Sequence, residues 1–132
     1  MGTFSENMFF SREHMWVSVE DDIATIGITD YAQGQIGEVL GIDMMDVGFS
    51  IERDEAFGSL ENARGVVDLV APVTGEIVSV NEDLFDDIGI LNSDPHEAGW
   101  IVVIEMKDKG ELSELLTAEE YNEFLMEEMG IG

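Results

Sequence analysis

The sequence contains no cysteine, only two prolines and only five basic residues among its 132 positions. Without cysteine there can be no disulfide framework, thiol nucleophile or thiolate metal site. No apolar run approaches the roughly 20 residues that span a bilayer. The opening Met-Gly-Thr-Phe-Ser-Glu-Asn lacks the basic start and apolar run of a secretory signal. We therefore expect a cytoplasmic protein with a single domain over residues 1–132.

The scarcity of basic residues leaves the chain strongly acidic. Thirty acidic residues against five basic ones give a formal net charge of −25 and a pI near 4.1. Such a surface repels phosphate groups and anionic lipids, so the composition argues against nucleic-acid and membrane-surface binding. Two explanations of the acidity stay open. It could provide solubility or adaptation to high salt, or it could steer the protein onto a basic partner.

The first third of the chain is typical of β-strands. Residues 15–19 and 23–28 are β-rich runs separated by a polar turn. Thr29 offers an N-cap to a short helical turn that we expect through residue 33. The next glycines do not have the spacing of a phosphate-binding loop, so we expect turns and bulges at Gly34, Gly37 and Gly41.

A short internal repeat indicates how the strands are arranged. Residues 37–43 (Gly-Glu-Val-Leu-Gly-Ile-Asp) and 75–81 (Gly-Glu-Ile-Val-Ser-Val-Asn) share the pattern Gly-Glu-β-β-x-β-Asx. Two such units separated by a hairpin predict two sheets related by a pseudo-two-fold axis, each burying one face against the other. We expect this mainly β sandwich to occupy about residues 8–106.

The C-terminal part changes to helical periodicity. Thr117 and Glu120 have the spacing of a capping box, in which each side chain bonds the backbone N–H of the other residue. An apolar stripe follows at helical spacing, formed by Tyr121, Phe124, Leu125 and Met129. We expect a C-terminal helical segment over about residues 111–129 that packs on the sandwich, with partner binding as the alternative role of the stripe.

The most informative stretch is residues 61–81, Glu-Asn-Ala-Arg-Gly-Val-Val-Asp-Leu-Val-Ala-Pro-Val-Thr-Gly-Glu-Ile-Val-Ser-Val-Asn. Two β-rich runs flank a short turn at 62–65, and the segment 71–75 leads into a second predicted hairpin. The stretch resembles the lipoyl-lysine hairpin of the glycine cleavage system H-protein family. In that family a lysine at the turn carries lipoic acid, and Asp and an Ala-Pro-Val-Ser/Thr-Gly segment follow. This chain keeps Asp68 and Ala-Pro-Val-Thr-Gly, but Arg64 stands at the lysine position.

The resemblance covers nearly the whole chain. Residues 10–16, Phe-Ser-Arg-Glu-His-Met-Trp, are similar to the family's Tyr/Phe-Ser/Thr-x-Glu-His-Glu-Trp opening. Residues 27–33, Gly-Ile-Thr-Asp-Tyr-Ala-Gln, match its next segment, and residues 92–100 resemble Asn-Ser-x-Pro-Tyr-x-x-Gly-Trp. The resemblance implies the family's fold, a lipoyl/biotinyl-domain-like barrel-sandwich hybrid with a C-terminal α-helix.

The departures from the family fall at positions on which its chemistry depends. Lipoate attachment needs a lysine amine that attacks an activated carbonyl, and the delocalised, permanently protonated guanidinium of Arg64 cannot replace it. Met15 stands where the family has a glutamate that, by the resemblance, lines the cleft sheltering the loaded amine. The predicted cofactor-site positions are therefore Arg64, Asp68 and Met15. No cofactor is expected, because lipoate would require lysine at position 64.

Other chemistry finds little support in the sequence. His14 and His96 lack paired ligand spacing, so no metal site is predicted, and we expect His14 to be a hydrogen-bonded structural residue. No Ser-His-Asp or nucleotide-binding pattern is present, and we do not expect an enzyme.

The sequence thus predicts an H-protein-like protein that cannot be lipoylated and that binds proteins. Partners are expected among glycine cleavage components or lipoyl-handling enzymes with basic faces. The alternative is a true lipoyl and aminomethyl carrier of the glycine cleavage system in which lysine has been replaced by arginine. The coincident change at Met15 and the altered residues Asn62 and Gly65 favour natural divergence. An enzyme or metal protein reusing the cleft near His14 has the least support.

Overall fold

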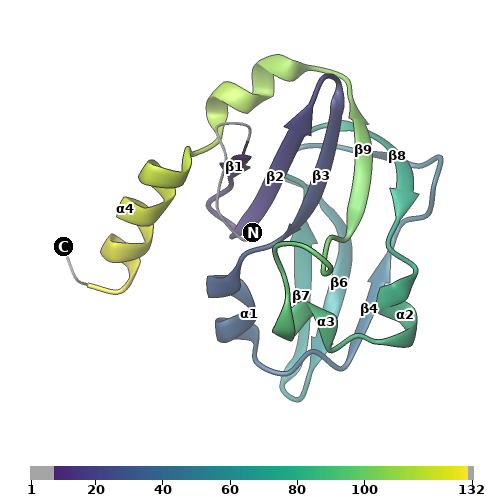
Figure 1. Cartoon of the computed structure of the whole chain (residues 1–132), viewed down its shortest axis with the longest axis vertical. Coiled ribbons are helices and arrows are strands. Elements are labelled where there is room, and N and C mark those ends of the chain that lie inside the picture. Colours follow the sequence, from purple (N-terminus) through teal and green to yellow (C-terminus); the bar gives the residue numbers. More distant parts are fainter. Residues whose placement is uncertain (1–7, 131–132) are drawn as a thin grey trace.

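The computed structural model describes residues 8–130, which form two antiparallel β-sheets and a peripheral C-terminal helix (Figure 1). The larger sheet has the order β1 (Met8–Phe10), β2 (Met15–Glu20), β3 (Ile23–Ile28), β9 (Val102–Met106), β8 (Gly75–Val80) and β5 (Ser50–Ile51). The smaller sheet has the order β4 (Gly41–Met44), β6 (Ala56–Asn62) and β7 (Gly65–Val70). The predicted mainly β sandwich with a C-terminal helix is confirmed.

Buried side chains of both sheets meet in one main core. The larger sheet contributes residues such as Ile26 and Ile77, and the smaller sheet contributes Leu60 and Leu69. All four are essentially inaccessible to solvent. Burial of this apolar surface, at about 25 cal/mol per Å², is the main force that holds the two sheets together.

Strand β2 does not simply alternate buried and exposed residues, because it is covered on both faces. Met15 and Val17 belong to the main core, whereas Trp16 belongs to a second cluster with Phe10, Leu116 and Tyr121. The second cluster fixes the C-terminal region to the outer face of the larger sheet. This explains why three consecutive residues of β2 are buried.

The internal repeat has a structural counterpart. Its two copies lie in different sheets, and Val39 and Ile77 occupy corresponding buried positions, while the following Leu40 and Val78 are exposed. The regular strand begins only at Gly41 in the first copy, but at Gly75 in the second. The predicted second hairpin after residue 75 is wrong in detail. β8 pairs with β9 and β5, because the segment 71–74 crosses from the smaller sheet to the larger one.

The helices are short, apart from the last one. They are α1 (Asp30–Ile36), α2 (Asp83–Asp86), α3 (Ile90–Ser93), a 3-10 helix (Lys109–Glu114) and α4 (Ala118–Glu128). The Thr29 hydroxyl accepts from the Ala32 N–H at 3.1 Å, which confirms the N-cap. The helix continues past residue 33, so Gly34 lies within it and not in a turn. It ends at Ile36, and the C-cap residue Gly37 has φ of 80°, which favours glycine.

The capping box of α4 is confirmed. Thr117 Oγ1 accepts from the Glu120 N–H at 3.2 Å, and the Glu120 carboxylate accepts from the Thr117 N–H at 3.0 Å. Tyr121 is buried, and Phe124 and Leu125 pack partly against the second cluster. Met129, expected in the same stripe, lies beyond the end of the helix and is half exposed, because the cluster does not extend that far.

Candidate functional site

The β6–β7 hairpin presents Ala63 and Arg64 at its tip. The strands pair up to Asn62 and Gly65, which confirms the predicted turn. Gly65 has φ of 145°, a conformation that residues with a side chain rarely adopt. Glycine at this position therefore lets the chain enter β7 directly after Arg64.

Asn62 fixes the tip against α1. Its Nδ2 donates to the carbonyl oxygen of Ile36 at 2.9 Å, and its Oδ1 accepts from the backbone N–H of Arg64 at 2.9 Å. The second bond is the usual Asx turn, in which a side chain bonds the backbone two residues on. With 8% of its surface exposed, Asn62 is a buried polar residue whose hydrogen bonds specify the position of the tip.

The guanidinium of Arg64 caps the C-terminal end of α1. Its Nη2 donates to the carbonyl oxygens of Gln35 at 3.0 Å and Ile36 at 3.3 Å. The last turn of α1 carries no basic residue of its own. A cation near these carbonyls satisfies orphan acceptors and interacts favourably with the helix dipole. Arg64 thus has a structural role that the sequence did not indicate.

A cavity of about 430 Å³ lies between the hairpin tip, the end of α1 and the loop after it. Leu40 and Glu38 of this loop line it together with Arg64. The carbonyl of Glu61 accepts from the Leu40 N–H at 2.7 Å and ties this loop to β6. Arg64 therefore lies on a braced, solvent-accessible tip.

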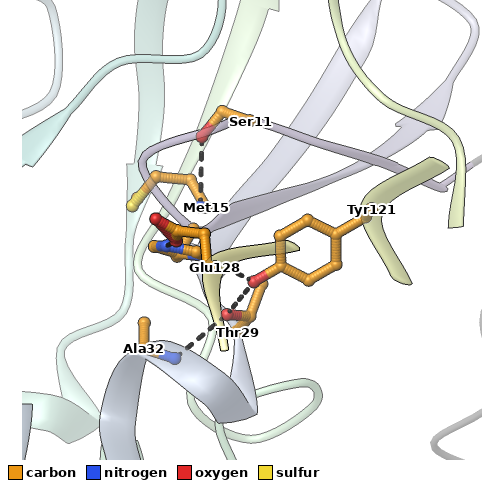
Figure 2. Close-up of polar contacts among 7 residues, drawn as sticks. Ser11, Met15, Thr29, Ala32, Tyr121 and Glu128 are labelled. Atoms are coloured by element: carbon orange, nitrogen blue, oxygen red, sulfur yellow. Dashed lines mark hydrogen bonds and ion pairs between the residues drawn. The ribbon is translucent and has the colours of Figure 1, made fainter. Parts of the chain in front are cut away.

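Met15 does not lie on this surface. Its side chain is 2% exposed and belongs to the main core, and its strand pairs residue by residue with β3, opposite Ile28. Its backbone N–H donates to the Ser11 hydroxyl at 3.1 Å (Figure 2). The side chain acts as a core residue that supplies polarizable apolar contacts and no charge.

Asp68 lies on β7 opposite Ser59 of β6, and its side chain is exposed. It shares the hairpin with Arg64, whereas Met15 belongs to the other sheet. None of the hydrogen bonds among residues 8–130 joins the three predicted positions. The structure therefore brings Arg64 together with Asn62 and α1, and not with Met15.

A polar network joins α4 to the junction of β3 and α1. The Tyr121 hydroxyl lies 2.8 Å from Oγ1 of Thr29 (Figure 2). It also lies 2.9 Å from Nδ1 of His14. Nε2 of His14 lies 3.0 Å from a carboxylate oxygen of Glu128. Burial raises the pKa of Tyr121 to about 12. His14 is thus a hydrogen-bonded structural residue, as predicted. Tyr121 was predicted only as a member of an apolar stripe, so the hydrogen bonds of its buried hydroxyl were not expected.

His96 takes part in a separate contact. Its Nε2 accepts from the backbone N–H of Asp30 at 2.9 Å, and burial lowers its pKa against the opposing effect of Asp30 and Asp94. Within residues 8–130, no group of three or more His, Asp or Glu side chains could hold a metal ion. None of the described helices is long and apolar enough to cross a membrane.

Comparisons with known proteins agree with this fold. A model of the family described as "Glycine cleavage H-protein" matches residues 8–128. The "Glycine cleavage system H protein 4" of Aquifex aeolicus is 46% identical over 119 residues, which cover 90% of this chain and 70% of that protein. The "Glycine cleavage system H protein" of Halalkalibacterium halodurans is 41% identical over 128 residues, covering 97% and 100%. The crystal structure of a glycine cleavage system H protein from Mycobacterium marinum superposes with a TM-score of 0.84 at 29% identity, covering 92% and 98%.

Proposed function

The chain belongs to the glycine cleavage H-protein family, and on that premise we propose that it is a member without lipoate that acts by binding other proteins. Members of this family are carrier proteins and not enzymes. A carrier of this kind depends on covalent attachment of lipoate at the hairpin tip.

The residue at the hairpin tip is the main support for the proposal. By the family resemblance Arg64 stands at the lysine position, and its guanidinium donates to two backbone carbonyls of α1. A guanidinium stays protonated and its nitrogens are delocalised, so it does not attack an activated acyl group. The two lysines of the chain, Lys107 and Lys109, follow β9 and lie outside the hairpin. No residue of the tip can therefore be acylated in the way a lysine can.

The environment of Met15 supports the same conclusion. In the family resemblance, this position supplies a carboxylate to the cleft that shelters the loaded amine. Here the side chain is enclosed by apolar residues of the core. A buried thioether gives an ammonium group neither charge nor a strong hydrogen-bond acceptor. The two positions have thus changed in a consistent direction, away from holding an aminomethyl group.

Protein partners follow from the family and from the charge. We propose glycine cleavage components or lipoyl-handling enzymes that present basic faces, since a net charge of −25 favours encounter with such surfaces. The competing function is that of a true carrier in which lysine was replaced by arginine, which the identity of 46% to a protein named "Glycine cleavage system H protein 4" favours. A lysine codon at position 64 of the native gene would decide for this alternative.

The test is the intact mass of the protein after co-expression with a lipoyl ligase in the presence of lipoate. We expect the unmodified mass, while a lipoyl domain that the ligase modifies serves as positive control in the same cells. A lipoyl mass increment on this chain would show that it is a carrier after all.

A further inference from the structure

We propose that a groove between β4 and α2 is a docking surface for a protein segment that carries apolar side chains between lysine or arginine residues. The groove has a volume of about 440 Å³ and is lined by Met44, Met45, Asp46, Val80, Glu82, Phe85 and Asp86. In Figure 1, β4 and α2 lie on the side of the molecule opposite α4. The inference rests on the proposed protein-binding function and names its surface.

The groove combines an apolar floor with exposed apolar edges. Met44 and Val80 form the floor and pack against the main core. Met45 and Phe85 stand at the edges, and 39% and 58% of their surfaces are exposed. Methionine and aromatic residues are enriched at the centres of protein interfaces, and the flexible methionine side chain adapts its shape to a partner.

The loop that follows β4 exposes two further apolar side chains. Val47 and Phe49 are both more than half exposed. Backbone bonds from Gly48 to Ile77 and from Ile77 to Phe49, each of 2.9 Å, hold this loop beside β8. Val47 and Phe49 are therefore presented on a hydrogen-bonded backbone, which lowers the entropic cost of ordering this loop when a partner binds.

The charges around the groove define the partner. Asp46, Glu82 and Asp86 are exposed at its rim. Four of the five basic side chains make other contacts: Arg12 with the Phe124 ring, Arg53 with Asp54 and Glu114, Arg64 with carbonyls at the end of α1, and Lys109 with Asp22. Among residues 8–130, none of the ion pairs involves any of the rim carboxylates. A partner's ammonium or guanidinium would complement them and could also stack on the Phe85 ring.

The same charges exclude the other occupants of an apolar groove. Nucleic acid and anionic lipid would bring phosphates against three carboxylates. A second copy of this chain would bring its own net charge of −25. A basic, partly apolar protein segment is the occupant that can both bury apolar side chains on the floor and pair its cations with the carboxylates of the rim.

The first experiment maps where a model segment binds. The probe is a synthetic amphipathic peptide of leucine and lysine at helical spacing, titrated into isotope-labelled protein and followed by NMR. We expect amide shifts at Met45, Asp46, Phe85 and Asp86. Peptides with glutamate in place of lysine, or serine in place of leucine, should bind at least about 10-fold more weakly, because each lacks one half of the complementarity.

Matched variants distinguish peptide binding in the groove from attraction by the general negative charge of the surface. Phe85→Ser should weaken peptide binding about 10-fold, whereas Met126→Ser on α4, where 44% of the side chain is exposed, should not change it. The pair Glu82→Gln with Asp86→Asn should weaken binding more than Glu119→Gln with Glu123→Gln on α4, although both pairs change the net charge equally. These side chains are exposed, so circular dichroism should show the same fold in every variant.

Equal losses in the two charge pairs, shifts centred outside the groove, or absence of peptide binding would each overturn the groove as a docking surface. None of these results bears on lipoylation, which the mass measurement decides separately. Failure of the groove and failure of the proposed function are therefore distinguishable.

Discussion

The side chain of Asn62 joins the hairpin tip to Ile36 at the end of α1, with an Nδ2–O distance of 2.9 Å. The same carbonyl also accepts from Arg64, so one backbone oxygen is shared by two side chains of the hairpin. This contact links residues 26 positions apart and fixes the position of the tip. It also makes the tip's rigidity testable by substitution.

Asn62→Ala should lower the free energy of unfolding by about 1–2 kcal/mol, because two hydrogen bonds of a buried side chain are lost. Arg64→Ala should cost less, about 0.3–1 kcal/mol, since the guanidinium is exposed to solvent. Urea denaturation measures both, with Asn122→Ala on the exposed face of α4 as control. A loss for Asn62→Ala no greater than for the control would mean that the tip is not braced by α1.

Arg64→Lys restores an amine at the tip and should accept lipoate from the ligase, which intact mass detects. The lipoylated variant should support glycine cleavage at least about 10-fold more slowly than an ordinary H-protein, because a missing hydrogen bond to a charged group is worth about 1.5–3 kcal/mol. Full activity from this single substitution would show that Met15 is unimportant and favour the carrier alternative.

Met15→Glu should destabilise the protein by about 3–5 kcal/mol at neutral pH, because it places an unpaired charge in the core. The loss should shrink as the pH falls, since burial raises the pKa of such a carboxyl group and the neutral form is tolerated better. Met15→Leu keeps the volume and should cost less than about 1.5 kcal/mol. A Met15→Glu protein as stable as the wild type would place position 15 in a hydrated cleft.

The buried hydroxyl of Tyr121 should make stability fall at high pH. Its pKa is about 12 in the folded protein and 10.0 when unperturbed, so the unfolded chain loses its proton first. The stabilisation is complete below pH 10 and is lost as the pH rises toward 12, at up to about 1.4 kcal/mol per pH unit. Tyr121→Phe should flatten this part of the curve much more than Tyr31→Phe, because Tyr31 contributes only a smaller electrostatic effect to the raised pKa of Tyr121. Equal flattening by the two variants would contradict the assignment.

Salt should act on association and on stability in opposite ways. As the Debye length shrinks from ~30 Å to ~8 Å, encounter with the leucine–lysine peptide should slow if the acidity serves steering. Screening of self-repulsion should raise the melting temperature in any case. Stopped-flow binding and melting curves over the same salt range measure the two effects. A steep rise in melting temperature with salt-independent association would identify the acidity as salt adaptation.

Local features of this fold followed from the sequence because their causes lie within a few residues. Thr29 and Thr117 begin helices through bonds to N–H groups three residues on. Asn62 and Gly65 bound the predicted turn, and the repeat at 37–43 and 75–81 predicted two sheets. The family resemblance also predicts that Arg64 stands at the lysine position, and both this assignment and its consequence for lipoylation remain predictions.

The tertiary structure alone decided what these positions contact. Arg64 caps α1 across 28 and 29 positions, and Tyr121 meets His14 across 107. Trp16 is buried between the core residues Met15 and Val17 because β2 is covered on both faces, which alternation in one strand cannot reveal. Hydrogen bonds and burial of this kind depend on which elements pack together. The sequence by itself therefore determined the main strands, the helices and the hairpin turn. Tertiary packing determined which contacts the side chains of these elements make.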